Sequence, residues 1–401
     1  MNIRIEVKNR YLVLTMGMII QLCAGIIYMW SVFKEPVSAH LAWNPASASI
    51  TSSFMLSAFV LGTIAGGYLQ DKYTPTPIAL LGSVLLGLGM IFSAFTPQSN
   101  PWLIYIFYGI IGGFGVGCVY TATVSVVQKW FPDKRGFATG MMVGAFGFSL
   151  VLFVPVTKLL LASWGVPTTF TFLGILFLII CSFCSLFICN PQTTGQSIAA
   201  TAVSTQRQYT TSEMLKTKNF YLLTLSLFFI LPTYFILNPL FISLGVDRGL
   251  TENMAALGVM ITGVASASGR LITPWVSDFI GRKAGILITA FLTFVSALVM
   301  IFAEGTVFLI CITVIAFSLG SAASVYAATT ADLFGTKHMG LNYGCVMIGF
   351  GLSVLIFPLV SNVLASTGVY TYSFLLAAAT CVITFILVMF LKIPKHTQQK
   401  V

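Results

Sequence analysis

The chain has 401 residues, of which 57% are hydrophobic and only 7% are charged. Its mean hydropathy is +0.96, so a water-soluble globule would leave large apolar surfaces exposed to water. Composition therefore excludes a soluble fold and predicts a protein embedded in a lipid bilayer. The formal net charge of +10 is then interpreted as an orientation signal rather than a nucleic-acid patch.

Twelve apolar stretches are long enough to cross ~30 Å of hydrocarbon, for which a helix needs ~20 residues. They lie near residues 11–32, 49–69, 77–95, 102–126, 136–162, 167–188, 220–241, 254–277, 284–302, 306–328, 341–364 and 371–391. The first follows a basic tail but is longer than the apolar core of a signal peptide, so we interpret it as a retained helix.

The longest hydrophilic stretch, residues 190–219, is rich in Thr, Ser and Gln and divides the spans six and six. Such a composition is typical of a linker. The predicted fold is an all-α membrane protein with an N-terminal six-helix bundle at residues 1–189 and a C-terminal one at residues 220–401. The linker between them is expected to be cytoplasmic.

Positive charge is distributed unevenly over the tails and loops. Sixteen of the twenty Lys and Arg residues fall in the tails or in the loops after even-numbered spans, and only Lys34 and Arg248 fall in the opposite loops. Because positively charged loops stay in the cytoplasm, both termini are expected there. Lys158 lies about one turn from the outer end of its span, where it can reach the lipid headgroups. The absence of a targeting segment fits a bacterial inner membrane.

The cysteines and histidines follow no pattern that is typical of a disulfide framework or a metal site. All eight cysteines fall within or at the ends of spans, and the three histidines lie in loops or the tail. The GxGxG spacing within residues 109–117 follows no predicted strand, which argues against nucleotide binding. We expect no metal, no cofactor and no nucleic-acid partner.

Two pairs of matching loops indicate a duplicated six-helix unit. Asp71 after span two and Asp278 after span eight lie 207 residues apart. A Phe-Gly-Gly pattern at Phe131, Gly136 and Gly140 recurs after span ten, at offsets of 203 to 204 residues. Two separate matches at nearly one offset are hard to obtain by chance.

These loops carry a resemblance to a known family. DFIGRK at residues 278–283 resembles the signature loop of the major facilitator superfamily, and QDKYTP at residues 70–75 resembles a degraded copy of it. WFPDKRGFATG at residues 130–140 and DLFGTKHMGLNYG at residues 332–344 resemble the oxalate/formate antiporter group, which is related to the monocarboxylate transporters. The resemblance covers essentially all twelve spans and implies two pseudo-symmetric six-helix bundles around a central cavity.

Arg270 lies deep in the apolar segment 255–276, with no acidic residue beside it. A lone guanidinium is costly to bury, and charges inside the membrane are usually retained for function. Its planar fork of donors matches the two oxygens of a carboxylate. We therefore interpret Arg270 as the anchor of a small anionic substrate. The alternative is a structural arginine that is satisfied by backbone carbonyls or by an acid from another helix.

The nature of the anion follows from span eleven. The resemblance implies a second cation there in the oxalate-transporting relatives, near the position of Phe350, but span eleven contains no lysine or arginine. A dianion would lack its second counter-charge and would be costly to bury. A monocarboxylate of the lactate, pyruvate or formate class fits better, with Phe350 facing its apolar part.

Further residues are expected around the substrate. The resemblance places Tyr28, Tyr120 and Phe146 in the cavity, while depth along span ten places Tyr326 there. Tyrosine hydroxyls can donate to a carboxylate. Ser266, one turn from Arg270, is positioned to orient that side chain or the ligand. For the aromatic residues the alternative is simple helix packing.

Acid and base pairs in the loops after even-numbered spans are expected to control gating. Asp71 with Arg135 or Lys134, and Asp278 with Arg282, would bridge helix ends while the cavity faces outward, and would separate when it opens inward. The alternative is that these charges only orient the chain and cap helices.

The predicted function is a secondary transporter that moves a small monocarboxylate by alternating access. The alternative is an exchanger of oxalate, formate or another organic anion. A membrane enzyme is disfavoured because no HExxH or GxSxG motif is present. Because no carboxylate or histidine is predicted in the cavity, exchange and protonation of the substrate site both stay open. The expected partners are the organic anion, the lipid bilayer and a proton or counter-anion, with the chain acting as a monomer.

Overall fold

The computed structural model describes residues 9–191, 207–237, 241–365 and 370–393, and within these ranges it consists of helices without a strand. The helices are α1 (Arg10–Ala24), the 3-10 helix η1 (Gly25–Tyr28), α2 (Trp30–His40), α3 (Pro45–Lys72), α4 (Pro75–Ala94), the π-helix η2 (Tyr105–Gly112), α5 (Gly113–Trp130), α6 (Arg135–Ser185), α8 (Thr211–Met214), α9 (Lys218–Ile230), α10 (Pro232–Leu237), α11 (Phe241–Asp247), α12 (Glu252–Ile280), α13 (Arg282–Val299), α14 (Gly305–Phe334), α15 (Met339–Ala365) and α16 (Thr371–Phe390). The all-α prediction is confirmed.

The helices account for the twelve predicted spans. Among the described residues, ten helical segments are long and apolar enough to cross a membrane. One of them, α6, holds the fifth and sixth spans, which meet at Gly165 with φ 71° and ψ −178°. Glycine adopts a positive φ without the steric cost that other residues meet, so the chain reverses there. The predicted eighth span corresponds to α12.

The first helix of each bundle is broken, which the sequence analysis did not predict. Residues 11–32 divide into α1, η1 and α2, and residues 220–237 divide into α9 and α10. Pro232 begins α10 and has no backbone N–H, so the hydrogen-bond ladder is interrupted at that point. The last part of the seventh span, residues 238–240, lies outside the described residues. The break after α1 places Tyr28 at the end of η1.

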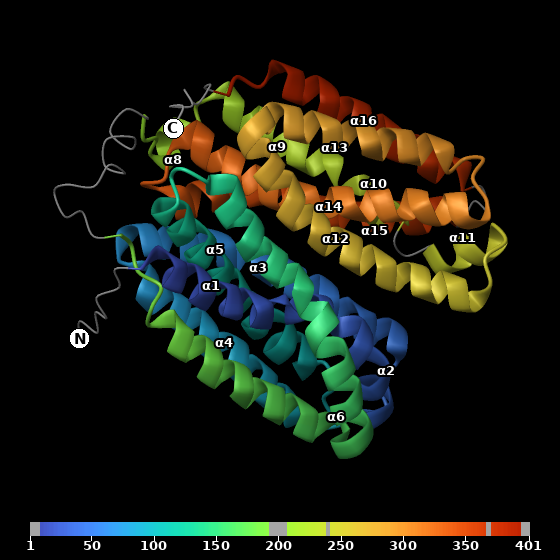
Figure 1. Ribbon diagram of the computed structural model, residues 1–401. Helices are drawn as coiled ribbons and strands as arrows, with labels where there is room; N and C mark the ends of the chain where they lie inside the picture. The colour runs from blue at the N-terminus through green and yellow to red at the C-terminus, as the bar shows by residue number, and fades with distance from the viewer. Residues whose placement is uncertain (1–8, 192–206, 238–240, 366–369, 394–401) are drawn as a thin grey trace.

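Helices α1 to α6 form one bundle and α9 to α16 form the other (Figure 1). The described chain begins at α1 and ends after α16 on the same side of the molecule, here called the terminal side. The predicted linker at residues 190–219 contains the short helix α8, whose N-cap Thr210 forms a capping box with Glu213. Residues 192–206 lie outside the described residues, so these domain boundaries stay a prediction.

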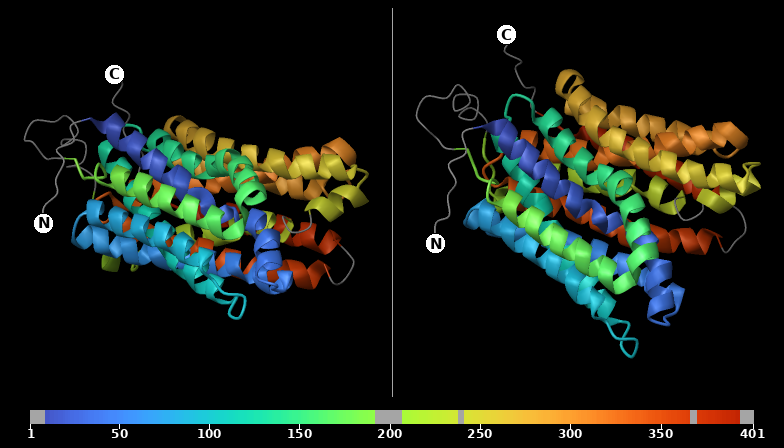
Figure 2. Two further views of the ribbon diagram at one scale, coloured as in Figure 1. Left: turned by 90° about the horizontal axis from the view of Figure 1, so that it is seen from below. Right: turned by 60° about the horizontal axis from the view of Figure 1, so that its bottom comes forward.

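The two bundles pack against each other through α6 with α12 and through α3 with α15. On the terminal side the helices approach closely: any side chain at Gly136 of α6 would collide with the carbonyl oxygen of Pro274 in α12. Away from that side the two bundles diverge toward α2 and α11 (Figures 1 and 2). The tight interbundle contacts are therefore concentrated at the terminal side.

Candidate functional site

A small cavity lies between the two bundles. Its volume is about 20 Å³, which is room for about one water molecule. The lining residues from the first bundle are Tyr28, Phe59, Tyr120, Val143 and Phe146, and those from the second are Leu227, Arg270, Ala323, Tyr326, Tyr343, Met347 and Phe350. Arg270 is the one charged residue in this lining, which is otherwise mostly aromatic and aliphatic.

The guanidinium of Arg270 reaches from α12 across to the first bundle. One terminal nitrogen, Nη2, donates to the Tyr28 hydroxyl at 3.5 Å, a long hydrogen bond. The guanidinium carbon lies 5.3 Å from the centre of the Tyr28 ring and 5.8 Å from that of Phe146, within the range of cation–π contacts. In the described part of the chain, Arg270 forms no ion pair and its Nε has no hydrogen-bond partner.

Aromatic rings pack around this guanidinium. The Phe146 ring stands edge-on to both Tyr28 and Tyr120, with centroid distances of 5.6 Å and 5.3 Å. Phe59 and Phe350 meet across the bundle interface at 6.3 Å. Such T-shaped contacts are preferred between aromatic rings and stiffen the wall. The structure thus places a buried positive charge at the edge of a cavity whose other lining residues are mostly aromatic and aliphatic.

Five of the six residues predicted to surround Arg270 line the cavity with it: Tyr28, Tyr120, Phe146, Tyr326 and Phe350. Ser266 is not in the lining, and its backbone packs instead against Gly320 of α14. The remaining lining residues were not predicted from the sequence: Phe59, Val143, Leu227, Ala323, Tyr343 and Met347. Tyr343 belongs to the Asn-Tyr-Gly segment that carried the family resemblance. That segment was the one feature of the sequence that could have indicated a place for Tyr343 in the site.

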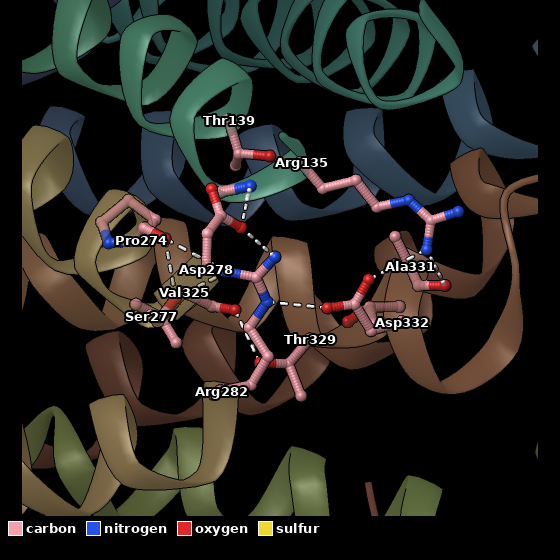
Figure 3. A network of polar contacts seen from close by, with 12 residues as sticks. Arg135, Thr139, Pro274, Ser277, Asp278, Arg282, Val325, Thr329, Ala331 and Asp332 are labelled. Atoms are coloured by element: carbon pink, nitrogen blue, oxygen red, sulfur yellow. Dashed lines mark hydrogen bonds and ion pairs between the residues drawn. The ribbon is translucent and has the colours of Figure 1, made fainter. Parts of the chain in front are cut away.

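The terminal side holds a buried network of ion pairs centred on Asp332 of α14 (Figure 3). Its carboxylate accepts from Arg135 of the first bundle at 2.9 Å and from Nε of Arg282 at 2.7 Å. Arg282 also pairs with Asp278 at 2.5 Å and donates to the Pro274 carbonyl at 3.1 Å. Asp332 is 2% exposed, so the network lies in a region of low dielectric constant. Loss of this carboxylate would leave both arginines with an uncompensated buried charge.

Two carboxylates bind helix N-termini across the bundle interface. Asp278 at the end of α12 accepts from the backbone N–H groups of Gly136 and Phe137, in the first turn of α6, at 3.0 and 2.9 Å. Asp71 at the end of α3 accepts from the Leu341 N–H, in the first turn of α15, at 2.9 Å. Each acid therefore meets the positive end of a helix dipole in the opposite bundle.

These contacts revise the predicted ion pairs. The pairing of Asp278 with Arg282 is present. The predicted pairing of Asp71 with Arg135 or Lys134 is wrong, because Arg135 binds Asp332 and Asp71 binds a backbone N–H group. The role of Asp332 was missed, because its two partners lie far away in the sequence.

The polar groups in the cavity lining are hydrogen-bond donors. The lining contains no Ser, Thr, Cys, His, Asp or Glu side chain that would act as a nucleophile or general base, and its donors are one guanidinium and the tyrosine hydroxyls. Across the described residues, no group of three or more His, Cys, Asp or Glu is placed to hold a metal ion. An acceptor-only anion such as a carboxylate matches these donors.

Comparison with known proteins agrees with the fold and the loops. A sequence profile described as "Major Facilitator Superfamily" matches residues 13–241 and, as a second match, residues 223–401. The solved structure of a transporter of that superfamily, FucP in the outward conformation, superposes with a TM-score of 0.72 at 17% identity, covering 94% of this chain and 98% of the other. This likeness concerns the fold.

Curated relatives are similar along most of their length. The oxalate:formate antiporter of Oxalobacter formigenes is 28% identical over 388 residues, covering 95% of this chain and 91% of the relative. Monocarboxylate transporter 13 of Bos taurus is 23% identical over 359 residues, covering 88% and 82%. Both matches extend through both bundles.

Proposed function

Because this chain belongs to the major facilitator superfamily and is thus a multi-pass membrane transporter, we propose that it moves a small monocarboxylate by alternating access. The observation that carries this proposal is Arg270. It is 5% exposed, lies at the interface of the two bundles, and has one long hydrogen bond to a neutral hydroxyl. A guanidinium with donors left over, facing a cavity, is a site for a carboxylate.

The proposed substrate carries one charge. The lining supplies one cation and includes Phe350, near which the resemblance implies a second cation in the oxalate-transporting relatives. A substrate of the lactate, pyruvate or formate class would pair its carboxylate with Arg270 and place any methyl group against the aromatic wall. A dicarboxylate would bury one carboxylate without a counter-charge, which is costly.

The second candidate is exchange of oxalate, formate or another organic anion. It is favoured by the similarity to the oxalate:formate antiporter over 95% of this chain. The two candidates share Arg270 as the anion anchor. They differ in whether the cavity accepts a dianion and in whether return of the carrier requires a second anion or a proton.

We assign the terminal side to the cytoplasm, because the tails and the loops on that side carry most of the lysine and arginine residues. The molecule is then closed toward the cytoplasm. In this proposal, Asp71 and Asp278 hold the closed state through the helix N-termini, and Arg135 and Arg282 hold it through Asp332. We also propose that the chain divides into a bundle at residues 1–189, a linker at residues 190–219 and a bundle at residues 220–401. The transporter is proposed to act as a monomer.

Uptake into liposomes tests the proposed function. Purified wild-type protein should accumulate radiolabelled lactate, pyruvate or formate, and Arg270→Ala should reduce uptake to the level of empty liposomes. Lys158→Ala is the matched control, because it removes an exposed cation from α6 away from the cavity. Uptake that survives in Arg270→Ala, or that falls equally in Lys158→Ala, would contradict the role assigned to Arg270.

A further inference from the structure

Two tyrosines from opposite bundles meet on the terminal side of the cavity. Tyr120 of α5 and Tyr343 of α15 place their hydroxyl oxygens 3.2 Å apart, and their rings stack with centroids 6.3 Å apart at 27°. Tyr343 lies four residues into α15, whereas Arg270 lies ten residues from the end of α12. At ~1.5 Å per residue, the Tyr343 backbone lies ~9 Å nearer the terminal side than that of Arg270.

The direction of this hydrogen bond is linked to a second contact of Tyr343. The Tyr343 hydroxyl also contacts the backbone carbonyl of Ala323 at 3.4 Å. A carbonyl oxygen can only accept, and a phenol has one proton to donate. Either hydroxyl can be the donor in the bond between the two; with the Tyr343 proton on Ala323, Tyr120 is the donor. In that arrangement, both hydroxyl protons are used within the protein.

A bound carboxylate would compete for the Tyr120 proton. Tyr120 and Arg270 line the same small cavity, and the Phe146 ring contacts both of them. An ionised carboxylate accepts hydrogen bonds and donates none, and bonds to a charged acceptor are stronger than those between neutral hydroxyls. With Tyr120 as the donor to Tyr343, a carboxylate on Arg270 gains the Tyr120 proton only if Tyr120 releases Tyr343.

We propose that the Tyr120–Tyr343 bond couples substrate binding to opening of the terminal side. A carboxylate bound at Arg270 takes the hydrogen bond of Tyr120, so that the link between α5 and α15 beneath the cavity is lost. Tyr343 is a positioning residue in this scheme, since it acts on the substrate through Tyr120. The proposal rests on the proposed function of the Arg270 site.

Substitution of each tyrosine by phenylalanine separates this coupling from simple packing. Both changes remove one oxygen and break the same interbundle bond. Tyr343→Phe frees the Tyr120 proton for the substrate, so the Kd for lactate, pyruvate or formate should fall several-fold. Tyr120→Phe removes the donor itself, so the Kd should rise about ten-fold. Isothermal titration calorimetry on the purified full-length protein measures both values.

Accessibility of the terminal side gives the second measurement. Thr121 is fully buried and donates to the Gly340 carbonyl across the bundle interface at 3.4 Å. Thr121→Cys, in a background with the eight native cysteines replaced by alanine, therefore reports opening of that side to a maleimide. Substrate should raise its labelling rate in the wild-type background, and both tyrosine variants should raise the rate without substrate.

Tyr108→Phe is the matched control, because its buried hydroxyl donates to the Ile26 carbonyl at 3.2 Å within the first bundle and does not line the cavity. It should leave the labelling rate without substrate unchanged. The coupling is refuted if Tyr343→Phe and Tyr120→Phe change the Kd in the same direction, or if substrate does not change labelling. Failure of every probe to bind, or binding that survives in Arg270→Ala, would instead overturn the proposed function on which the coupling rests.

Discussion

Arg270 in the cavity and Arg282 on the terminal side are buried to the same degree but are satisfied very differently. They are 5% and 7% exposed. Arg282 pairs with two carboxylates and donates to the Pro274 carbonyl and the Ser277 hydroxyl. Arg270 has one long hydrogen bond to a neutral hydroxyl and two aromatic faces. Two arginines of similar burial therefore differ in how far the protein itself satisfies their charge and their donors.

What separates them is the number of donors that the protein itself leaves unused. At the terminal side the acids come from the chain, so the charges are balanced whether or not a ligand is present. In the proposed function, an anion from outside supplies the acceptor for Arg270 in the cavity. A buried charge without an internal partner is costly, and such a cost is usually maintained by function.

The largest expected effect comes from removing the acid at the centre of the terminal-side network. Asp332→Asn should destabilise the protein by ~3 kcal/mol or more, because two buried guanidinium groups lose their carboxylate. Denaturant unfolding followed by circular dichroism measures the loss. Asp133→Asn is the control, since its pair with Arg10 is 47% and 38% exposed and should contribute less than ~1 kcal/mol. Equal losses in the two variants would remove the distinction between buried and exposed pairs.

A second cation in the cavity should alter which anion is bound. Phe350→Lys places an ammonium opposite Arg270 and should improve oxalate binding relative to lactate by ~30-fold, which corresponds to ~2 kcal/mol for a charged hydrogen bond. Competition between unlabelled oxalate and labelled lactate measures the ratio, with Phe350→Met as an apolar control. An unchanged ratio in Phe350→Lys would mean that position 350 does not face the bound anion.

Stability without substrate should change in opposite directions for the two arginines. Arg270→Met should raise the free energy of unfolding by ~1 kcal/mol, because it replaces a buried charge that has no counter-charge by an apolar side chain. Substrate binding should be lost in the same variant. Arg282→Met should lower it, because Asp278 and Asp332 lose a common partner. Thermal unfolding in detergent without ligand compares the two. A loss of stability in Arg270→Met would show that Arg270 is a structural residue.

The smallest expected effect concerns the helix-binding acids. Asp278→Asn should raise the maleimide labelling of Thr121→Cys a few-fold, because a carboxylate at a helix N-terminus contributes ~0.3–1 kcal/mol. Asp71→Asn should have a smaller effect, because Asp71 accepts one backbone N–H group whereas Asp278 accepts two and binds Arg282. Unchanged labelling in Asp278→Asn would leave that carboxylate as a helix cap without a part in gating.

The spans and the repeat were predictable because they depend on local properties of the chain. Hydropathy over ~20 residues marks a membrane helix whatever its neighbours are. Arg270 was identified for the same reason, since the sequence alone shows a single charge within an apolar segment. The break after α1 was not predictable, because the hydropathy of an apolar stretch is the same whether its helix is continuous or interrupted.

The network on the terminal side escaped prediction because its partners are remote. Arg135 and Asp332 are separated by 197 residues and meet only when the two bundles pack together. Asp71 was predicted to pair with a basic side chain, because charged side chains can be identified from sequence. Its partner in the structure is the Leu341 backbone N–H group, which sequence does not reveal. Tyr343 gains its place in the cavity from the same packing.

The most direct test of the account is calorimetric binding of lactate, pyruvate, formate and oxalate to wild-type protein and to Arg270→Ala. The account predicts that one or more monocarboxylates bind the wild-type protein more tightly than oxalate does, and that no binding is detected with Arg270→Ala. Oxalate as the one bound ligand would contradict the inference from Phe350. Monocarboxylate binding of equal affinity in Arg270→Ala would contradict the central claim that the unpaired arginine holds the substrate.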